Sequence, residues 1–442
     1  MKSVLAPDRA VFLVFLVSVM FMGYAVDRSS FAQVLLGYSL AFAAFFHLVE
    51  SKDRMSVKRM WIYALTLRLI LLFSIPKLSN DYFRFIWDGL VQWEGMSPFA
   101  HLPSAVQRLE WAELYMGLNS KDYYSVYPPV MQSVFRISTA LSGTSILGNL
   151  IFMRAVLILA DVLLIKVGYK LLELLKRSQQ DMVFFALNPL VILECTGNLH
   201  FEGMMMAFAL LGIYMLARAS EKPGLKAILL GGIAMTTGVL TKLTSLLAFP
   251  VLVRRIVWVN TLLISVLSSL VMVFAFWPLM DVETLHNMAS SLDLYFRNFQ
   301  FNSSLYNVVD ALTAKEIPHY RAEIIGPWIA GSGALFMGLL ILFRKAKDWT
   351  AYMETFLFVL SIHLLFASAV HPWYIVNLLA VSLFTRFRYP VVWSFTAVLS
   401  YQFYGLGYES PFLLVLEYLP VIGYAIWEFR SRPSLIQDMQ PR

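Results

Sequence analysis

The hydrophobic pattern divides the chain into long apolar runs separated by short polar segments. A helix needs about 20 apolar residues to cross a bilayer, and most of the runs approach that length. We predict 12 to 14 spanning helices, with 14 preferred, at 10–27, 31–50, 60–77, 150–175, 181–197, 203–219, 226–241, 243–253, 256–278, 324–343, 350–370, 373–386, 389–405 and 412–429. The run at 243–253 can cross only if its helix is broken or the membrane is locally thin.

Basic residues predict the orientation of these helices. Cytoplasmic loops carry an excess of Lys and Arg, and the segment 51–60 contains four of these residues. The short connections near 197–202, 371–373 and 406–411 contain none. We therefore expect both termini in the cytoplasm and the uncharged turns on the outer face.

Three segments depart from this simple alternation. Residues 128–143 are apolar, but counting them as a full span would place the basic residues Lys176 and Arg177 on the outer face. We therefore interpret this segment as an interfacial or re-entrant helix. The segments 78–127 and 279–323 are too long to be turns, and long loops in compact proteins are usually functional. We expect both long segments on the outer face.

Composition supports a polytopic membrane protein. Hydrophobic residues make up 59% of the 442 residues and charged residues 14%, against about 25% charged in soluble proteins. We interpret 1–442 as one all-α integral membrane domain, which has the lipid bilayer as a partner. The single cysteine, Cys195, excludes an internal disulfide, and the net charge of +7 forms no cluster that indicates a nucleic-acid partner.

Four polar residues recur at helical spacing in the first long outer segment. Asp81, Arg84, Asp88 and Gln92 fall at i, i+3, i+7 and i+11, which places them on one helix face. The opposite face is apolar and is typical of a helix lying on a membrane surface. The alternative is an ordinary surface helix whose polar side faces water.

A second polar group lies in the turns assigned to the same face. Asn198, His200 and Glu202 alternate in one turn, and His371 lies at another. Three segments with many polar and charged residues are thus assigned to one membrane face, and a polar cavity open to the outside is the simplest explanation. The alternatives are that the turns are polar only because they are turns, and that His371 beside Pro372 is structural. Two cations share this face, Lys242 and Arg297.

Charged residues also occur within the apolar runs. Arg68, Arg154, Asp161 and Glu354 are costly there and should face protein or a water-filled cavity. Arg154 and Asp161 are two turns apart on one helix face, which predicts a network with a neighbouring helix. We favour a structural role for Asp161.

Four sequence runs resemble those of known enzymes. The segments 81–99, 126–135, 188–202 and 371–374 are similar to segments of polytopic glycosyltransferases of the GT-C superfold. The resemblance is to glycosyltransferase family 87 and related polyprenol-phosphate-mannose-dependent mannosyltransferases. It implies a GT-C-like helical bundle whose long first outer loop carries surface helices.

The resemblance implies a role for individual residues. Asp81 matches the acid that serves as catalytic base, and Glu202 stands where relatives often have Asp. The resemblance, together with the polar or charged character of the side chains, leads us to expect ten substrate-binding residues. They are Arg84, Asp88, Gln92, Tyr127, Asn198, His200, Glu202, Lys242, Arg297 and His371.

These residues predict a hexosyltransferase of the bacterial plasma membrane. A polyprenyl-phosphate donor, whose sugar the resemblance implies to be mannose, would pass that sugar to a hydroxyl of a cell-envelope glycan or glycolipid on the outer face. Asp81 would take the hydroxyl proton, and direct displacement predicts inversion. No Gly-rich phosphate loop indicates a nucleotide sugar. No cofactor is required, although Asp81, Asp88 and Glu202 could bind a divalent cation.

Two other functions fit part of the sequence. A transporter or flippase for a lipid-linked sugar would explain the many helices, but it predicts matching interrupted helices in two halves, which the sequence lacks. A non-catalytic assembly partner would not need the acidic cluster.

Overall fold

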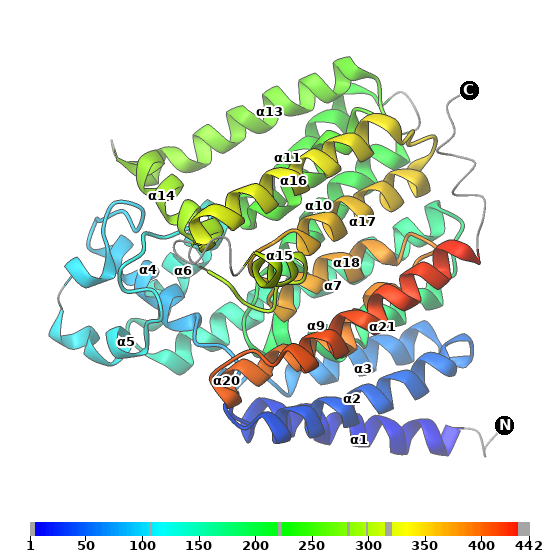
Figure 1. Cartoon of the computed structure of the whole chain (residues 1–442), viewed down its shortest axis with the longest axis horizontal. Helices are drawn as coiled ribbons and strands as arrows, with labels where there is room; N and C mark the ends of the chain where they lie inside the picture. Colours follow the sequence, from blue (N-terminus) through cyan, green and yellow to red (C-terminus); the bar gives the residue numbers. More distant parts are fainter. Residues whose placement is uncertain are drawn as a thin grey trace.

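The long helices run side by side (Figure 1). A computed structural model describes residues 5–106, 108–219, 223–280, 283–297, 299–313 and 321–431. Apart from one isolated bridge between Phe301 and Ala369, the regular structure in these ranges is helical. The all-α prediction is confirmed.

The predicted spans correspond closely to helices. The longest are α1 (Leu5–Tyr24), α2 (Phe31–Glu50), α3 (Val57–Leu69), α7 (Ile146–Leu174), α10 (Glu202–Arg218), α11 (Leu225–Thr241), α13 (Trp258–Phe276), α16 (Arg321–Phe343), α17 (Trp349–Leu365) and α21 (Pro411–Arg430). Shorter helices complete the predicted runs, namely α8 (Val183–Ala186), α9 (Pro189–Val191), α12 (Ala248–Leu252), α18 (Ile375–Ser382), α19 (Tyr389–Thr396) and α20 (Gln402–Leu406).

Length and composition mark the strongest membrane-crossing candidates. Among the described residues, four helices are long and apolar enough to cross alone: Phe31–Glu50, Trp258–Leu279, Glu323–Phe343 and Pro411–Arg430. A bent pair, Pro189–Gly197 with Glu202–Arg218, is a fifth candidate. Shorter apolar helices such as α17 lie between them, and the total of 12 to 14 crossings stays a prediction.

The outer surface of several helices is apolar, as lipid contact requires. Phe274 of α13 is 82% exposed and Phe343 of α16 is 77% exposed. Large exposed apolar surfaces are unusual in soluble proteins. Together with the candidate spans, they identify an integral membrane protein.

The described parts of the two long segments 78–127 and 279–323 contain short helices. They contain α4 (Tyr82–Trp93), α5 (Ala112–Gly117), α14 (Thr284–Arg297) and α15 (Leu305–Leu312). The segment 128–143 forms the separate helix α6 (Pro129–Ser142). Figure 1 shows α4, α5 and α6 gathered at the end of the bundle opposite both termini.

A local apolar core holds α4 in place. The rings of Phe85 and Phe135 stack with centroids 4.7 Å apart, which joins α4 to α6. Trp87 meets Trp111 edge to face at 5.3 Å, beside α5. The apolar face of α4 is thus covered by protein.

Ion pairs join the basic loops to one another. The carboxylate of Asp181 forms ion pairs with Lys52 Nζ at 2.5 Å and with Arg388 Nη2 at 2.9 Å. Three segments that are distant in sequence therefore meet at this carboxylate. Glu354 pairs with Arg344 at 2.7 Å and with Arg386 at 3.1 Å. The loops that the basic residues mark as cytoplasmic therefore lie together at one end.

The other charges inside the apolar runs also form networks. Arg68 of α3 donates to Asp161 of α7 at 2.7 Å and to the carbonyl oxygen of Ala186 at 2.8 Å. Arg154 does not join this pair. It donates to the carbonyl oxygens of Thr196 and Gly197 at 2.8 and 3.0 Å, and so supports a polar turn described below.

Candidate active site

A broken helix builds the first part of the site. After α9 the chain continues as a π-helical segment, Ile192–Gly197, and α10 then begins at Glu202 after a bend of 107°. Leu199 lies between them with a φ of 64°, a left-handed conformation that bulky residues rarely adopt. Such local strain persists only where the surroundings enforce it, and it clusters at functional sites.

The break brings polar side chains around Glu194. Tyr401 donates to one carboxylate oxygen of Glu194 at 2.6 Å, and Asn198 donates to the other at 3.1 Å. His200 Nε2 lies 3.5 Å from that second oxygen. Glu194, Asn198 and His200 are all buried, so the turn forms a compact polar group inside the protein.

A stack of rings joins this turn to two other segments. The His200 ring lies 3.7 Å from Trp373, Trp373 lies 4.3 Å from His371, and His371 lies 4.6 Å from Phe301. Phe301 belongs to the second long outer segment, and its backbone pairs with Ser368 and Val370. The structure thus brings together the turns of His200 and His371.

Lys242 and Glu202 add an ion pair beside the stack, in which Glu202 is buried and Lys242 is partly exposed. Lys242, at the end of α11, pairs with Glu202 and lies 5.4 Å from the ring centre of Tyr374. The second carboxylate oxygen of Glu202, Nε2 of His200 and Nδ1 of His371 are buried without a hydrogen-bond partner in the described part of the chain. Buried polar atoms are normally hydrogen-bonded, and the grouping of three such atoms around Lys242 makes this cluster the candidate site.

Asp81 lies directly before α4, near enough for its charge to interact with those of Lys242, Glu194 and Glu202. Its Oδ1 accepts a hydrogen bond from Asn119 at 2.9 Å, and its side chain is half-buried. Burial raises the pKa of Asp81 above its ordinary value, and it outweighs the opposing effects of Asn119, Lys242 and Arg28. A carboxylate that is more basic than usual suits a general base.

Arg28 is a second cation at this end of the bundle. It lies in the turn between α1 and α2, donates to Asn80 at 3.4 Å, and packs 4.5 Å from the ring centre of Tyr404. Asn80 directly precedes Asp81, which brings Arg28 near the acid. Sequence reasoning missed Arg28, because a lone Arg in a short turn carries no distinguishing signal.

The two histidines are uncharged near neutral pH. Burial, with the nearby Lys242 and His371, holds the pKa of His200 well below 6.5. Burial and Lys242 lower the pKa of His371 to about 3. Both rings can exchange hydrogen bonds, but the fixed positive charge among these neighbours comes from Lys242 and Arg28.

The remaining polar residues of α4 lie in a different setting. Arg84 donates to Asp88 at 2.6 Å, and the second oxygen of Asp88 accepts from Ser125 at 2.6 Å and Gln132 at 2.9 Å. Gln92 donates to Gln132 at 2.8 Å. The helical face predicted from spacing exists, but it packs against α6 and the segment 118–125.

Arg84 reaches Asp81 only indirectly. Its guanidinium donates to the carbonyl oxygens of Ser120 and Tyr123 at 2.9 and 2.8 Å. Both carbonyls follow closely after Asn119, the residue that donates to Asp81. Arg84 therefore holds the loop that orients the acid.

Two further residues named from the sequence are Tyr127, which lies outside the central cluster, and Arg297. Tyr127 is half-buried and meets Phe85 edge to face at 5.2 Å. Arg297 ends α14, and its side chain lies outside the described residues. Among the described residues, no three His, Cys, Asp or Glu side chains are grouped so that they could hold a metal ion.

Two comparisons with known proteins agree with each other. The sequence profile described as "Alpha-(1->6)-mannopyranosyltransferase, N-terminal domain" matches residues 4–260. The "Alpha-(1->6)-mannopyranosyltransferase B" of Corynebacterium glutamicum is 24% identical over 189 aligned residues, which cover 39% of this chain and 30% of the relative. The profile match includes Asp81, the broken helix and Lys242, whereas His371 lies beyond it.

Proposed function

Because the chain belongs to the alpha-(1->6)-mannopyranosyltransferase family, we propose that it transfers mannose from a polyprenyl phosphate to an acceptor hydroxyl. Family membership supports a mannosyltransferase-type glycosyltransferase. The lipid donor, the glycan or glycolipid acceptor and the outer face of a bacterial plasma membrane are the finer parts of the proposal. The observation that carries it is Asp81 beside buried, unpartnered polar atoms and two cations.

Asp81 acts as the general base in this proposal. The acceptor oxygen attacks the anomeric carbon while its proton passes to the Asp81 carboxylate. The bond between the anomeric carbon and the phosphate oxygen breaks, and polyprenyl phosphate leaves with the electron pair. A single displacement of this kind inverts the anomeric centre. A well-placed base contributes about 10²–10⁴-fold to the rate.

The leaving phosphate needs fixed positive charge. Lys242 and Arg28 supply it, and His200 and His371 offer neutral ring nitrogens without partners. Preorganised donors and charges of this kind stabilise developing negative charge in a water-poor site. The donor lipid suits a GT-C-type site, because its sugar and phosphate lie at the headgroup level, where the broken helix opens.

In this proposal the substrate contacts Asn198, Glu202 and His371 in the cluster around Lys242. The contacts of Arg84, Asp88 and Gln92 hold α4 and the neighbouring loop, and so fix the position of Asp81. A divalent cation would need to take some of its ligands from the donor phosphate, as Mg²⁺ commonly does. Adding and chelating Mg²⁺ during the transfer assay measures that dependence.

A transfer assay tests the function directly. Purified protein should move radiolabel from mannosyl polyprenyl phosphate to a mannan acceptor, and GDP-mannose should give no product. Asp81→Asn should abolish transfer, whereas Asp122→Asn, at an exposed acid of the same loop, should retain it. Movement of the labelled lipid across proteoliposomes without any transfer would identify a flippase instead.

A labelling experiment tests the sidedness of the site. Cysteines replace Ser104 in the first outer segment and Lys345 in a basic loop, in a protein whose native Cys195 is buried. An impermeant thiol reagent should label position 104 and leave position 345 unlabelled in intact cells. The opposite pattern would place the site on the cytoplasmic face.

A further inference from the structure

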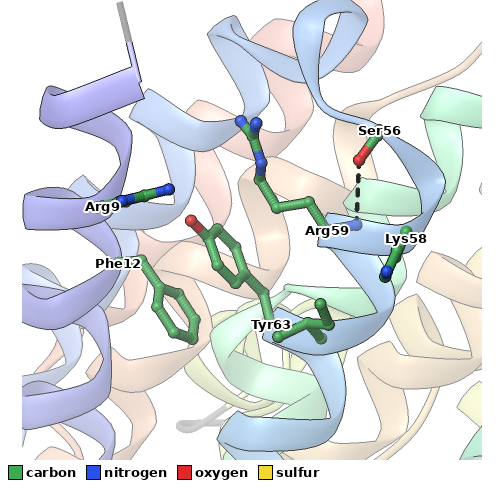
Figure 2. Close-up of a pocket in the computed structure, with 7 residues that line it drawn as sticks. Arg9, Phe12, Ser56, Lys58, Arg59 and Tyr63 are labelled. Atoms are coloured by element: carbon green, nitrogen blue, oxygen red, sulfur yellow. Dashed lines mark hydrogen bonds between the residues drawn. The ribbon is translucent and has the colours of Figure 1, made fainter. Parts of the chain in front are cut away.

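A concavity lined by basic, aromatic and aliphatic side chains lies between α1 and α3. It has a volume of about 430 Å³ and is lined by Arg9, Phe12, Ser56, Lys58, Arg59, Ile62 and Tyr63. It lies where α3 begins, at the end of the bundle that holds both termini (Figures 1 and 2). The candidate active site is formed by other residues at the opposite end.

Positive charge dominates the lining of this cavity. Arg9, Lys58 and Arg59 all contribute, and Figure 2 shows the Tyr63 hydroxyl directed between Arg9 and Arg59. One acid balances part of the charge, because Asp8 lies 3.6 Å from Arg59. The named groups leave two uncompensated cations, which favours an anionic ligand.

The backbone at the start of α3 adds to the same preference. Ser56 caps the helix by accepting the N–H of Arg59 at 3.2 Å. The N–H groups of Val57 and Lys58 precede the first intrahelical bonds and are left for other acceptors. A helix N-terminus attracts anions through these groups and its dipole.

Apolar surface continues from the charged cavity. Phe12 and Tyr63 stack with ring centroids 3.7 Å apart and close one side. Ile62, which lines the cavity, is 51% exposed, and Leu13 of α1 is 59% exposed. A free phosphate ion would make no contact with this apolar surface, whereas the acyl chains of a lipid would cover it.

We propose that this cavity binds the phosphate headgroup of an anionic glycerophospholipid from the leaflet at the N-terminal end. Basic pockets between membrane helices are suited to anionic headgroups. The proposal does not depend on the mannosyl donor or on Asp81.

Native mass spectrometry of the detergent-solubilised protein tests this site. The protein is titrated with phosphatidylglycerol, with phosphatidylcholine of the same acyl chains, and with glycerol 3-phosphate. The test variant Arg9→Gln/Lys58→Gln changes two exposed residues and keeps the contact between Asp8 and Arg59. The control Lys226→Gln/Lys345→Gln removes the same charge from exposed residues in other basic loops.

The wild type and the control should retain phosphatidylglycerol about tenfold more strongly than the test variant, and more strongly than they retain phosphatidylcholine. An unchanged thermal unfolding midpoint in lipid-free detergent shows that the test variant is folded. Equal retention by the test and control variants would overturn the site. Displacement of the lipid by glycerol 3-phosphate at equal concentration would show a water-soluble anion site and overturn the lipid assignment.

Discussion

Asp81 and the three polar residues that follow it on α4 lie in different environments. Arg84, Asp88 and Gln92 bond mainly to other protein groups, and both carboxylate oxygens of Asp88 are occupied. Asp81 accepts a side-chain hydrogen bond from Asn119 and lies near the cluster around Lys242. Among the described residues, the network around Asp88 leaves Nη2 of Arg84 without a partner but occupies both oxygens of Asp88, whereas in the cluster around Lys242 atoms of Glu202, His200 and His371 have no partner. We assign those three atoms to substrate.

The network around Arg84 and Asp88 also fixes the position of Asp81. Arg84 fixes the carbonyls of Ser120 and Tyr123, and the adjacent Asn119 holds Asp81. The motif in the first outer segment therefore combines a reacting group with its own scaffold. Substitutions at Asp81 and at Asp88 should therefore separate effects on turnover from effects on stability.

The largest expected effect is on stability. Asp88→Asn keeps the side-chain shape but leaves the buried charge of Arg84 without its carboxylate. Breaking one partner of a buried pair costs about 3–5 kcal/mol, so the unfolding free energy should fall by an amount near that range. Denaturant unfolding of the purified protein measures it, with Asp122→Asn as the exposed control. An unchanged unfolding curve would show that the network does not hold the loop.

The next effect concerns the charge on the leaving group. Lys242→Gln should lower the single-turnover rate by about 10²-fold, as loss of a preorganised charge-stabilising group does. It also leaves Glu202 buried without its partner. Adding Glu202→Gln should therefore restore the thermal midpoint without restoring the rate. Recovery of the rate in the double variant would mean that Lys242 serves only to neutralise Glu202.

A smaller effect is expected at the support for the base. Asn119→Ala removes a hydrogen bond that stabilises the ionised form of Asp81, so the pKa of Asp81 should rise further. The rate should fall by about fivefold, the value of a typical hydrogen bond, and the acidic limb of kcat/KM should move to higher pH. A pH–rate profile of both proteins measures the shift. A lower rate with an unmoved limb would indicate a different role for Asn119.

The smallest effect is expected at the histidines. Because the pKa of His200 lies well below 6.5, its ring is already neutral across about pH 6–8. His200→Gln should weaken donor use by a few-fold, the loss of about one hydrogen bond, without changing the profile over that pH range. A step near pH 6.5 that disappears in the variant would show that a charged imidazole takes part.

Sequence predicted the larger organisation well. Apolar runs located the helices, basic loops grouped together, and the resemblance to mannosyltransferases is confirmed by the family match. The turns of His200 and His371 were assigned to one face and meet in the structure. The helices and the grouping of loops follow from composition and spacing over whole segments, whereas the family follows from the resemblance of four sequence runs.

Local geometry limited the rest. A π-helical segment changes the spacing around Glu194, so its contact with His200 could not be read from periodicity. Spacing placed Asp88 on the polar face of α4, but its partner Gln132 lies 44 residues away on α6. Whether a polar face meets water or another helix depends on such distant contacts.

The central claim is that Asp81 takes the acceptor proton. Its most direct test is the single-turnover rate of Asp81→Asn with saturating mannosyl polyprenyl phosphate, measured beside donor affinity and thermal midpoint. The account predicts a rate at least about 10²-fold lower, with donor affinity and midpoint unchanged. A wild-type rate, or a loss explained entirely by weaker donor binding or unfolding, would contradict it.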